Sequence, residues 1–268
     1  MTALQTNQVQ QAEPHRTKLL ASVMNLEEAQ IALDGGADII DLKNPLAGAL
    51  GALPLDDIRT IVKMINRQRP VSATIGDLPM EPEIICAAVE ATANTGVDYI
   101  KIGFFKSENL RDCIAALSPL AQKHKLIAVL FADQQPDFSL LDDLAKAGFH
   151  GVMLDTADKQ NGSLSNHIQV IDLIEFILQS CKHDLLCGLA GSLRIGDVKE
   201  MLELKPDYLG FRSTLCQGSV REQKLSMGKL KTLKNAFTFS GNVITQFLQP
   251  ANVNCNHYIQ QRTPTQSS

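Results

Sequence analysis

An acid and an amine stand two residues apart at the end of an apolar stretch: Asp41 and Lys43 in ADIIDLKNP, residues 37–45. In an extended strand, residues i and i+2 point to the same face, so the two charged side chains are neighbours. Pro45 ends the strand, because proline has no N–H for a sheet ladder and restricts the residue before it. Buried charges are costly unless they are paired or used in chemistry. From this stretch alone, a structural ion pair and a catalytic pair are about equally favoured.

Other charged residues occupy the same place in three more apolar stretches. Lys101 lies inside the strand-like sequence Tyr-Ile-Lys-Ile-Gly, while Asp155 and Arg212 directly follow apolar stretches of their own. Two lysines that face one cavity make each other harder to protonate, so at least one of Lys43 and Lys101 should have a lowered pKa. A neutral amine can form a Schiff base with a carbonyl carbon. The second lysine can then move protons, helped by the carboxylates of Asp41 and Asp155.

Small residues follow two further stretches: Gly191 and Ser192 after one, and Gly210 and Ser213 on either side of Arg212 in the other. Such turns leave backbone N–H groups open, and barrels often hold phosphate there. Arg212 would add a two-pronged contact with phosphate. A single glycine turn is more often a plain turn. Two such turns beside an arginine make a phosphate site and plain turns about equally favoured.

Three other residue types bear on the chemistry. Lys159, four residues after Asp155, fits a solvated loop lysine and a contact with substrate phosphate equally well. The six histidines show no metal-binding spacing such as H-x-H or H-E-x-x-H, so we expect no metal site. We also expect no cofactor, because an imine on a lysine would do the work of a divalent ion. The six cysteines contain no C-x-x-C pair, which predicts reduced thiols.

The candidate residues can meet only if the stretches that carry them form one sheet. Eight strand-like stretches alternate with eight helical ones, and the strands are apolar on both faces, as in buried parallel sheets. We expect strands at 18–23, 38–43, 71–75, 99–104, 126–131, 151–154, 185–190 and 208–211. After the sixth strand we expect one long helix over 166–181, and after the eighth a helix over 223–236. The economical fold is a (β/α)8 barrel, with a doubly wound open sheet as the alternative.

A barrel would bring the charged residues together. Alternate strands of a barrel contribute to one interior layer, and chemistry gathers at the carboxyl ends of the strands. The charged side chains belong to the second, fourth, sixth and eighth strands, so we expect them to face one mouth.

The bulk composition is that of an ordinary soluble protein, with 44% apolar and 20% charged residues among 268. The net charge of −4 and the lack of a long basic run argue against nucleic-acid binding. No apolar run approaches the roughly 18–20 residues of a membrane span, and no secretory signal is recognisable, so we expect a cytoplasmic protein. We expect a flexible leader (1–16), a catalytic barrel (17–238) and a polar, mostly disordered tail (239–268) with one extra strand or helix near 243–248. The oligomeric state is open, with a homo-oligomer among the alternatives.

The chain resembles the (5-formylfuran-3-yl)methyl phosphate synthase family over roughly residues 18–235. The most specific motifs are D-x-K-N-P, S-A-T-x-G-D and L-D-T-A. The similar segments are GGADIIDLKNPLAGALGA (35–52), VSATIGDLP (71–79), DYIKIGFF (98–105), MLDTADKQNGSL (153–164), CGLAGSL (187–193) and LGFRSTLCQG (209–218).

This resemblance implies a (β/α)8-barrel lyase that condenses two molecules of glyceraldehyde 3-phosphate. The product would be 4-(hydroxymethyl)-2-furancarboxaldehyde phosphate, formed with loss of phosphate and water, on the way to methanofuran-type one-carbon carriers. It also implies that Lys43 is the Schiff-base lysine and Lys101 the proton-transferring lysine, with Asp41, Asp155 and Lys159 in support.

Two other functions remain open at the level of the sequence. The first is a class I aldolase that acts on sugar phosphates with the same lysine pair. The second is a barrel without catalytic activity that binds a phosphorylated metabolite. The intact lysine pair argues against the second alternative.

Overall fold

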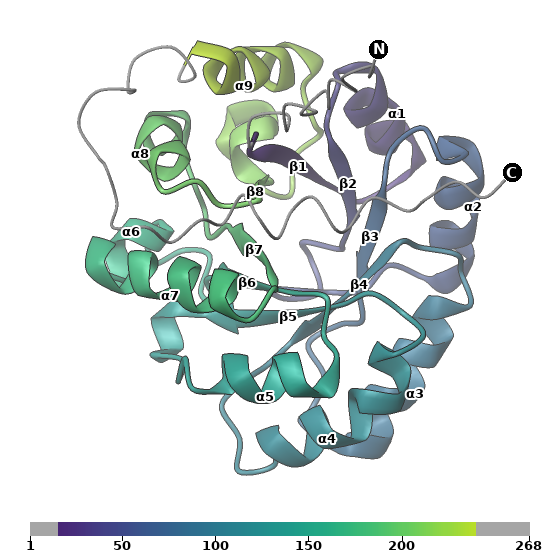
Figure 1. The fold of residues 1–268 in the computed structure, drawn as a ribbon. Helices are drawn as coiled ribbons and strands as arrows, with labels where there is room; N and C mark the ends of the chain where they lie inside the picture. The colour runs from purple at the N-terminus through teal and green to yellow at the C-terminus, as the bar shows by residue number, and fades with distance from the viewer. Residues whose placement is uncertain (1–15, 240–268) are drawn as a thin grey trace, which may run out of the picture.

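The structure is a computed structural model that describes residues 16–239. Its eight parallel strands close into a barrel in which β8 pairs with β1, and the helices surround the barrel (Figure 1). The strands are β1 (Lys18–Val23), β2 (Ile39–Leu42), β3 (Val71–Thr74), β4 (Tyr99–Gly103), β5 (Leu126–Phe131), β6 (Gly151–Asp155), β7 (Leu186–Leu189) and β8 (Tyr208–Phe211). The expected (β/α)8 barrel is confirmed, and the open doubly wound sheet is excluded.

Helices connect successive strands of the barrel. They are α1 (Leu26–Asp34), α2 (Leu55–Ile65), α3 (Pro82–Ala93), α4 (Leu110–Ala121), α5 (Leu140–Ala147), α6 (Leu164–His167), α7 (Val170–Lys182), α8 (Val198–Glu203) and α9 (Met227–Phe239). Asn25 caps α1 as its sequence predicts, because its side chain accepts the N–H of Glu28 at 2.9 Å. The carboxylate of Glu28 accepts the N–H of Met24 at 2.9 Å, one residue before the N-cap residue Asn25.

Two expected helices have different bounds in the structure. The single helix expected over 166–181 is two helices, α6 and α7, because Ile168 between them adopts an extended conformation with φ −141° and ψ 141°. Ile168 packs part-buried against the core, which the extended backbone allows. The last helix begins at Met227 and not at 223, since the preceding residues form a loop closed by the antiparallel bridge between Cys216 and Leu225.

Alternation along each strand separates two hydrophobic layers. Leu20, Met153 and Tyr208 belong to a small cluster inside the barrel, whereas Leu19 and Leu154 belong to the larger core between strands and helices. The interior cluster fills the barrel below its mouth, so the polar interior residues lie above an apolar floor.

The strand register sets the polar layer above that floor. Asp41 on β2 lies opposite Ser22 on β1 and Ser72 on β3. Lys101 on β4 lies opposite Thr74 on β3. Of the even-numbered strands, β2 and β4 bring their charged residues together at Asp41, which also accepts hydrogen bonds from Ser22 and Ser72 of the odd-numbered strands.

The described residues include little of the expected leader and tail. The expected tail, apart from Phe239, and the expected leader, apart from Arg16, lie outside the described residues, as does the element expected near 243–248. Arg16 forms an ion pair with Asp38 at 2.5 Å. No helix within residues 16–239 is long and apolar enough to cross a membrane.

The cysteines depart in part from expectation. Cys86, Cys113, Cys187 and Cys216 are free thiols. Cys181 is disulfide-bonded. The prediction of reduced thiols is therefore wrong for Cys181.

Gly188 on β7 tests the packing of the barrel floor. A Cβ atom at this position would stand 2.2 Å from Cζ of the buried Tyr208. We expect Gly188→Ala to lower the free energy of unfolding by about 1–3 kcal/mol, because the overpacked interior has no room to relax. The measurement is urea unfolding followed by circular dichroism. Gly196→Ala is the matched control, since its Cβ would meet no atom within 4 Å; equal unfolding midpoints for the two variants would contradict this account of the floor.

Candidate active site

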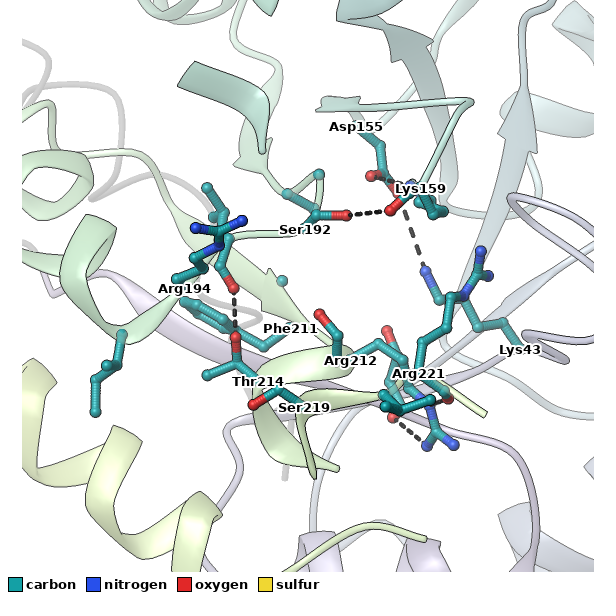
Figure 2. A pocket seen from close by; sticks show the side chains of 18 of the residues that line it. Lys43, Asp155, Lys159, Ser192, Arg194, Phe211, Arg212, Thr214, Ser219 and Arg221 are labelled. Atoms are coloured by element: carbon teal, nitrogen blue, oxygen red, sulfur yellow. Dashed lines mark hydrogen bonds and ion pairs between the residues drawn. The ribbon is translucent and has the colours of Figure 1, made fainter. Parts of the chain in front are cut away.

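A cavity of about 620 Å³ opens at the carboxyl ends of the strands, within the usual size range of small-molecule sites. Lys43, Lys101, Asp155 and Lys159 all line it. Figure 2 shows Lys43 and Asp155 facing each other across part of the cavity. The two lysines predicted to share one cavity therefore do so.

Asp41 and Lys101 form an ion pair that is closed to solvent. Nζ of Lys101 donates to both carboxylate oxygens of Asp41 at 3.0 Å, and the two side chains are 2% and 0% exposed. The hydroxyl groups of Ser22 and Ser72 donate to the same carboxylate at 2.8 and 2.6 Å. Burial works to raise the pKa of Asp41, but the charges of Lys101 and Lys43 and the hydrogen bonds outweigh it and lower the pKa. Asp41 therefore stays ionised and holds Lys101 in place.

Lys43 has no such close partner in the part of the chain that the structure describes. Its Nζ lies 4.0 Å from Oδ2 of Asp155, and its side chain is 7% exposed. Burial lowers the pKa of Lys43 to about 7, with the charge of Asp155 opposing the shift and those of Lys159 and Lys101 adding to it. About half of the Lys43 amines are then neutral at pH 7, which is the form that attacks a carbonyl carbon.

Asp155 is shared between two lysines and the backbone. Lys159 and the N–H of Thr156 both donate to Oδ1, the latter at 2.8 Å. Oδ2 accepts no hydrogen bond within the described part of the chain and faces Lys43. Burial works to raise the pKa of Asp155, but Lys159 and Lys43 outweigh it and lower the pKa to about 2. Asp155 is therefore a carboxylate at every pH relevant to catalysis.

Lys159 is not a solvated loop lysine. Its side chain is 9% exposed, and burial lowers its pKa against the opposing charge of Asp155. Asp133, at the end of β5, fixes the start of this loop by accepting the N–H groups of Ala157 at 2.8 Å and Asp158 at 2.7 Å. The loop thereby places the Lys159 amine inside the cavity.

The predicted phosphate residues after β7 and β8 also line the cavity. Gly191 and Ser192 adopt positive φ angles of 103° and 50°, which makes a tight turn after β7. Within the described residues, the backbone N–H groups of Gly191, Ser192 and Leu193 have no hydrogen-bond acceptor. Gly210 keeps the space clear, because a Cβ there would stand 2.9 Å from Cε of Met153. These features suit an anion, and the contact of Gly191, Ser192 and Ser213 with phosphate stays a prediction.

Arg212 has a different role from the one that its position in the sequence suggests. NH1 and NH2 contact the carboxylate of Glu28, with NH1 to Oε2 at 2.5 Å. Its remaining N–H groups donate to three carbonyl oxygens, those of Ser22, Arg221 and Gln223, at 3.2, 2.8 and 3.2 Å. A guanidinium has five N–H groups, and all are used. The two-pronged contact of Arg212 with phosphate does not fit this geometry, and its contacts are structural.

Sequence reasoning missed Arg194, Arg221 and Lys229, which line the cavity as well. None of them belongs to a strand or a recognised motif. The one feature of the sequence that points to Arg221 is its place in the loop that follows β8, because this loop borders the mouth of the barrel. Among residues 16–239, the lining contains seven lysine and arginine side chains and two carboxylates, Asp155 and Glu222, so the cavity favours anionic ligands.

The fold and the site define a class of protein. A closed (β/α)8 barrel with buried charged residues at the carboxyl ends of its strands has the architecture of an enzyme, and its cationic mouth suits an anionic substrate.

Comparison with known proteins identifies the family. The model of the 4-HFC-P synthase family matches residues 19–234. A protein of Methylorubrum extorquens is 41% identical over 212 residues, which cover 78% of this chain and 87% of the relative. The (5-formylfuran-3-yl)methyl phosphate synthase of Archaeoglobus fulgidus is 34% identical, over 75% of this chain and 91% of the relative. The chain belongs to the 4-HFC-P synthase family.

Solved structures share the fold at lower identity. Phosphoribosyl anthranilate isomerase of Thermus thermophilus superposes with a TM-score of 0.61 at 15% identity, over 83% of this chain and 99% of that structure. The 3-hexulose-6-phosphate synthase of Salmonella typhimurium gives 0.58 at 17% identity, over 84% and 100%. These similarities establish the barrel architecture alone.

The lowered pKa of Lys43 predicts its reactivity. Acetylation of Lys43 by acetic anhydride should rise with pH and level off, with a midpoint at about 7, because only the neutral amine reacts. Asp155→Asn should move this midpoint lower, since the charge of Asp155 is what opposes the loss of the proton. Mass spectrometry of the Lys43 peptide gives the rates, with the exposed Lys63 as the internal standard for reagent. A midpoint near the usual lysine value of about 10.4 would contradict the burial argument.

Proposed function

We propose that this protein is a (5-formylfuran-3-yl)methyl phosphate synthase, a carbon–oxygen lyase acting on phosphates. It condenses two molecules of glyceraldehyde 3-phosphate to 4-(hydroxymethyl)-2-furancarboxaldehyde phosphate with loss of phosphate and water. The product leads to the furan of methanofuran or methylofuran. Membership of the family supports this proposal, and so does one observation above the others: the buried amines of Lys43, Lys101 and Lys159 line one cavity together with the carboxylate of Asp155.

The reaction begins with the neutral amine of Lys43. Its nitrogen attacks the aldehyde carbon of one triose phosphate, and the N–C bond forms as the carbonyl oxygen takes up a proton. Lys101, ion-paired with Asp41 at 3.0 Å, is placed to deliver the proton that lets this oxygen leave as water. The resulting iminium withdraws electrons from the α-carbon.

Lys101 then acts as a general base. Having given up its proton, it can take the proton from the α-carbon, and the electron pair of that C–H bond moves to the iminium nitrogen as an enamine forms. The enamine carbon attacks the aldehyde of the second triose phosphate and makes the new C–C bond. Elimination of phosphate, closure of the ring through a hydroxyl oxygen and dehydration follow, and water releases Lys43 from the product.

The carboxylates have separate tasks in this scheme. Asp41 positions Lys101 and takes no proton itself, since its pKa is lowered. Asp155, with a pKa of about 2, is an anion that balances the positive charge of the Lys43 iminium across 4.0 Å. Lys159, bound to Asp155 and buried in the same cavity, is the proton donor for the leaving groups. Every step uses side chains of this chain, so the scheme includes no cofactor or metal.

The class I aldolase remains the second candidate, because the Lys43–Lys101 arrangement would serve it equally. It differs in its products, since an aldolase forms no furan and releases no inorganic phosphate. The barrel that only binds a phosphorylated metabolite predicts no turnover at all. The small-molecule substrate, the cytoplasmic location and the homo-oligomer stay predictions.

Incubation of the purified protein with glyceraldehyde 3-phosphate alone tests the proposal. We expect one inorganic phosphate per furan phosphate, detected by a phosphate assay together with furan absorbance and product mass. Lys43→Ala should abolish both, and Lys101→Met should lower kcat by about 10²- to 10⁴-fold because it removes general acid–base catalysis. Surface variant Lys146→Met, on α5, is the control. Reversible cleavage or joining of sugar phosphates without phosphate release would instead identify an aldolase.

A further inference from the structure

A buried ion pair between Glu28 and Arg212 holds the loop between β8 and α9 in place. Glu28 and Arg212 are 2% and 7% exposed, and they lie on α1 and directly after β8. Arg212 donates to the carbonyl oxygens of Arg221 and Gln223, and Glu28 accepts the N–H of Leu225 at 3.1 Å. The pair therefore fixes three points of the loop that carries Arg221, and the side chain of Arg221 starts from a defined position.

Arg221 differs from Arg212 in how its guanidinium is used. Its NH2 group donates one hydrogen bond, to the carbonyl oxygen of Gly48 in the loop after β2, at 2.9 Å. Glu222 lies 3.9 Å from Nε, which is too long for a hydrogen bond. Within the described residues the other N–H groups of this guanidinium have no acceptor. Its side chain is only 18% exposed and lines the cavity, so these donors are available to a ligand.

Arg221 and the turn after β7 serve different ends of the cavity. In Figure 2, Arg221 lies toward Lys43, whereas Arg194 and Thr214 lie on the opposite side and Ser192 lies beside Lys159, to whose carbonyl oxygen it donates at 3.4 Å. The charge of Arg221 also lowers the pKa of Lys159, which places the guanidinium within electrostatic reach of the reacting groups.

The charge of the substrates calls for two anion sites. Two triose phosphates carry two phosphate groups, which repel each other inside one cavity unless each has its own cationic or N–H partners. The open N–H groups of Gly191 to Leu193 suit one phosphate. One such turn cannot hold both phosphates, and a guanidinium with free donors suits the second phosphate dianion in a two-pronged contact.

We propose that Arg221 binds the phosphate of one of the two trioses, at a subsite separate from the turn at Gly191 and Ser192, and that Glu28 and Arg212 position it there. This inference rests on the proposed function, because that function supplies two phosphate groups. Arg221 is thus a specificity-determining residue that selects a phosphorylated aldehyde at the end of the cavity next to Lys43.

Titration calorimetry with glycerol 3-phosphate tests the subsite without chemistry, because this ligand has a phosphate but no carbonyl group. We expect two molecules to bind to each wild-type chain. Arg221→Gln should weaken one of the two sites by about tenfold to 100-fold, the usual range for loss of hydrogen bonds to a charged group, and leave the other unchanged. Arg221→Lys should lie in between, since it keeps the charge but not the two-pronged contact.

The controls separate this role from a structural one. Arg59→Gln, on the exposed surface of α2, should bind like the wild type. If Arg221→Gln weakens both sites alike, Arg221 only holds the loop against Gly48 and the inference is overturned. Unchanged binding at both sites overturns it too. Furan formation from glyceraldehyde 3-phosphate is measured separately on the wild type, so a failure of the proposed function would not be confused with a failure of the subsite.

Discussion

The site depends on an uneven sharing of two carboxylates among three buried lysines. Lys101 has Asp41 to itself at 3.0 Å, and Lys159 contacts Asp155 directly. Lys43 is left with the far oxygen of Asp155 at 4.0 Å. Desolvation penalises every buried charge, so the least compensated amine is the one that loses its proton. The arrangement therefore lowers the pKa of Lys43 to about 7, which suits the nucleophilic role proposed for it.

The barrel creates this inequality through strand register. Because β1, β2 and β3 run parallel with Asp41 opposite Ser22 and Ser72, two hydroxyl groups reach its carboxylate and help to fix its orientation. Asp155 comes from β6, on the other side of the barrel, and its orientation is set by a loop instead. Asp133 and Asp77 hold the loops after β6 and β2, Asp77 by accepting the N–H groups of Ala49 and Leu50. Rigid strands and pinned loops thus keep the lysines at unequal distances from their anions.

Much of this could be predicted from the sequence, and the reasons are local. Alternation and punctuation by glycine and proline locate the eight strands, and the period of two makes Asp41 and Lys43 neighbours. Barrel geometry then places Lys101 beside them. The role of Arg212 could not be predicted in this way, because its partner Glu28 lies 184 residues earlier in the chain. The position of Arg221 in the cavity could not be predicted for a related reason. Arg221 lies in a loop without a recognised motif, and the path of such a loop is set by tertiary contacts. The break at Ile168 is a third case, where packing overrides a continuous helical pattern.

The proposed mechanism depends on which of the three buried lysines bonds to the substrate. Reduction with borohydride during incubation with glyceraldehyde 3-phosphate, followed by peptide mapping by mass spectrometry, identifies that residue directly. The account predicts added mass on the peptide that contains Lys43 and none on those that contain Lys101 or Lys159. Added mass on either of the latter, with Lys43 unmodified, would contradict it.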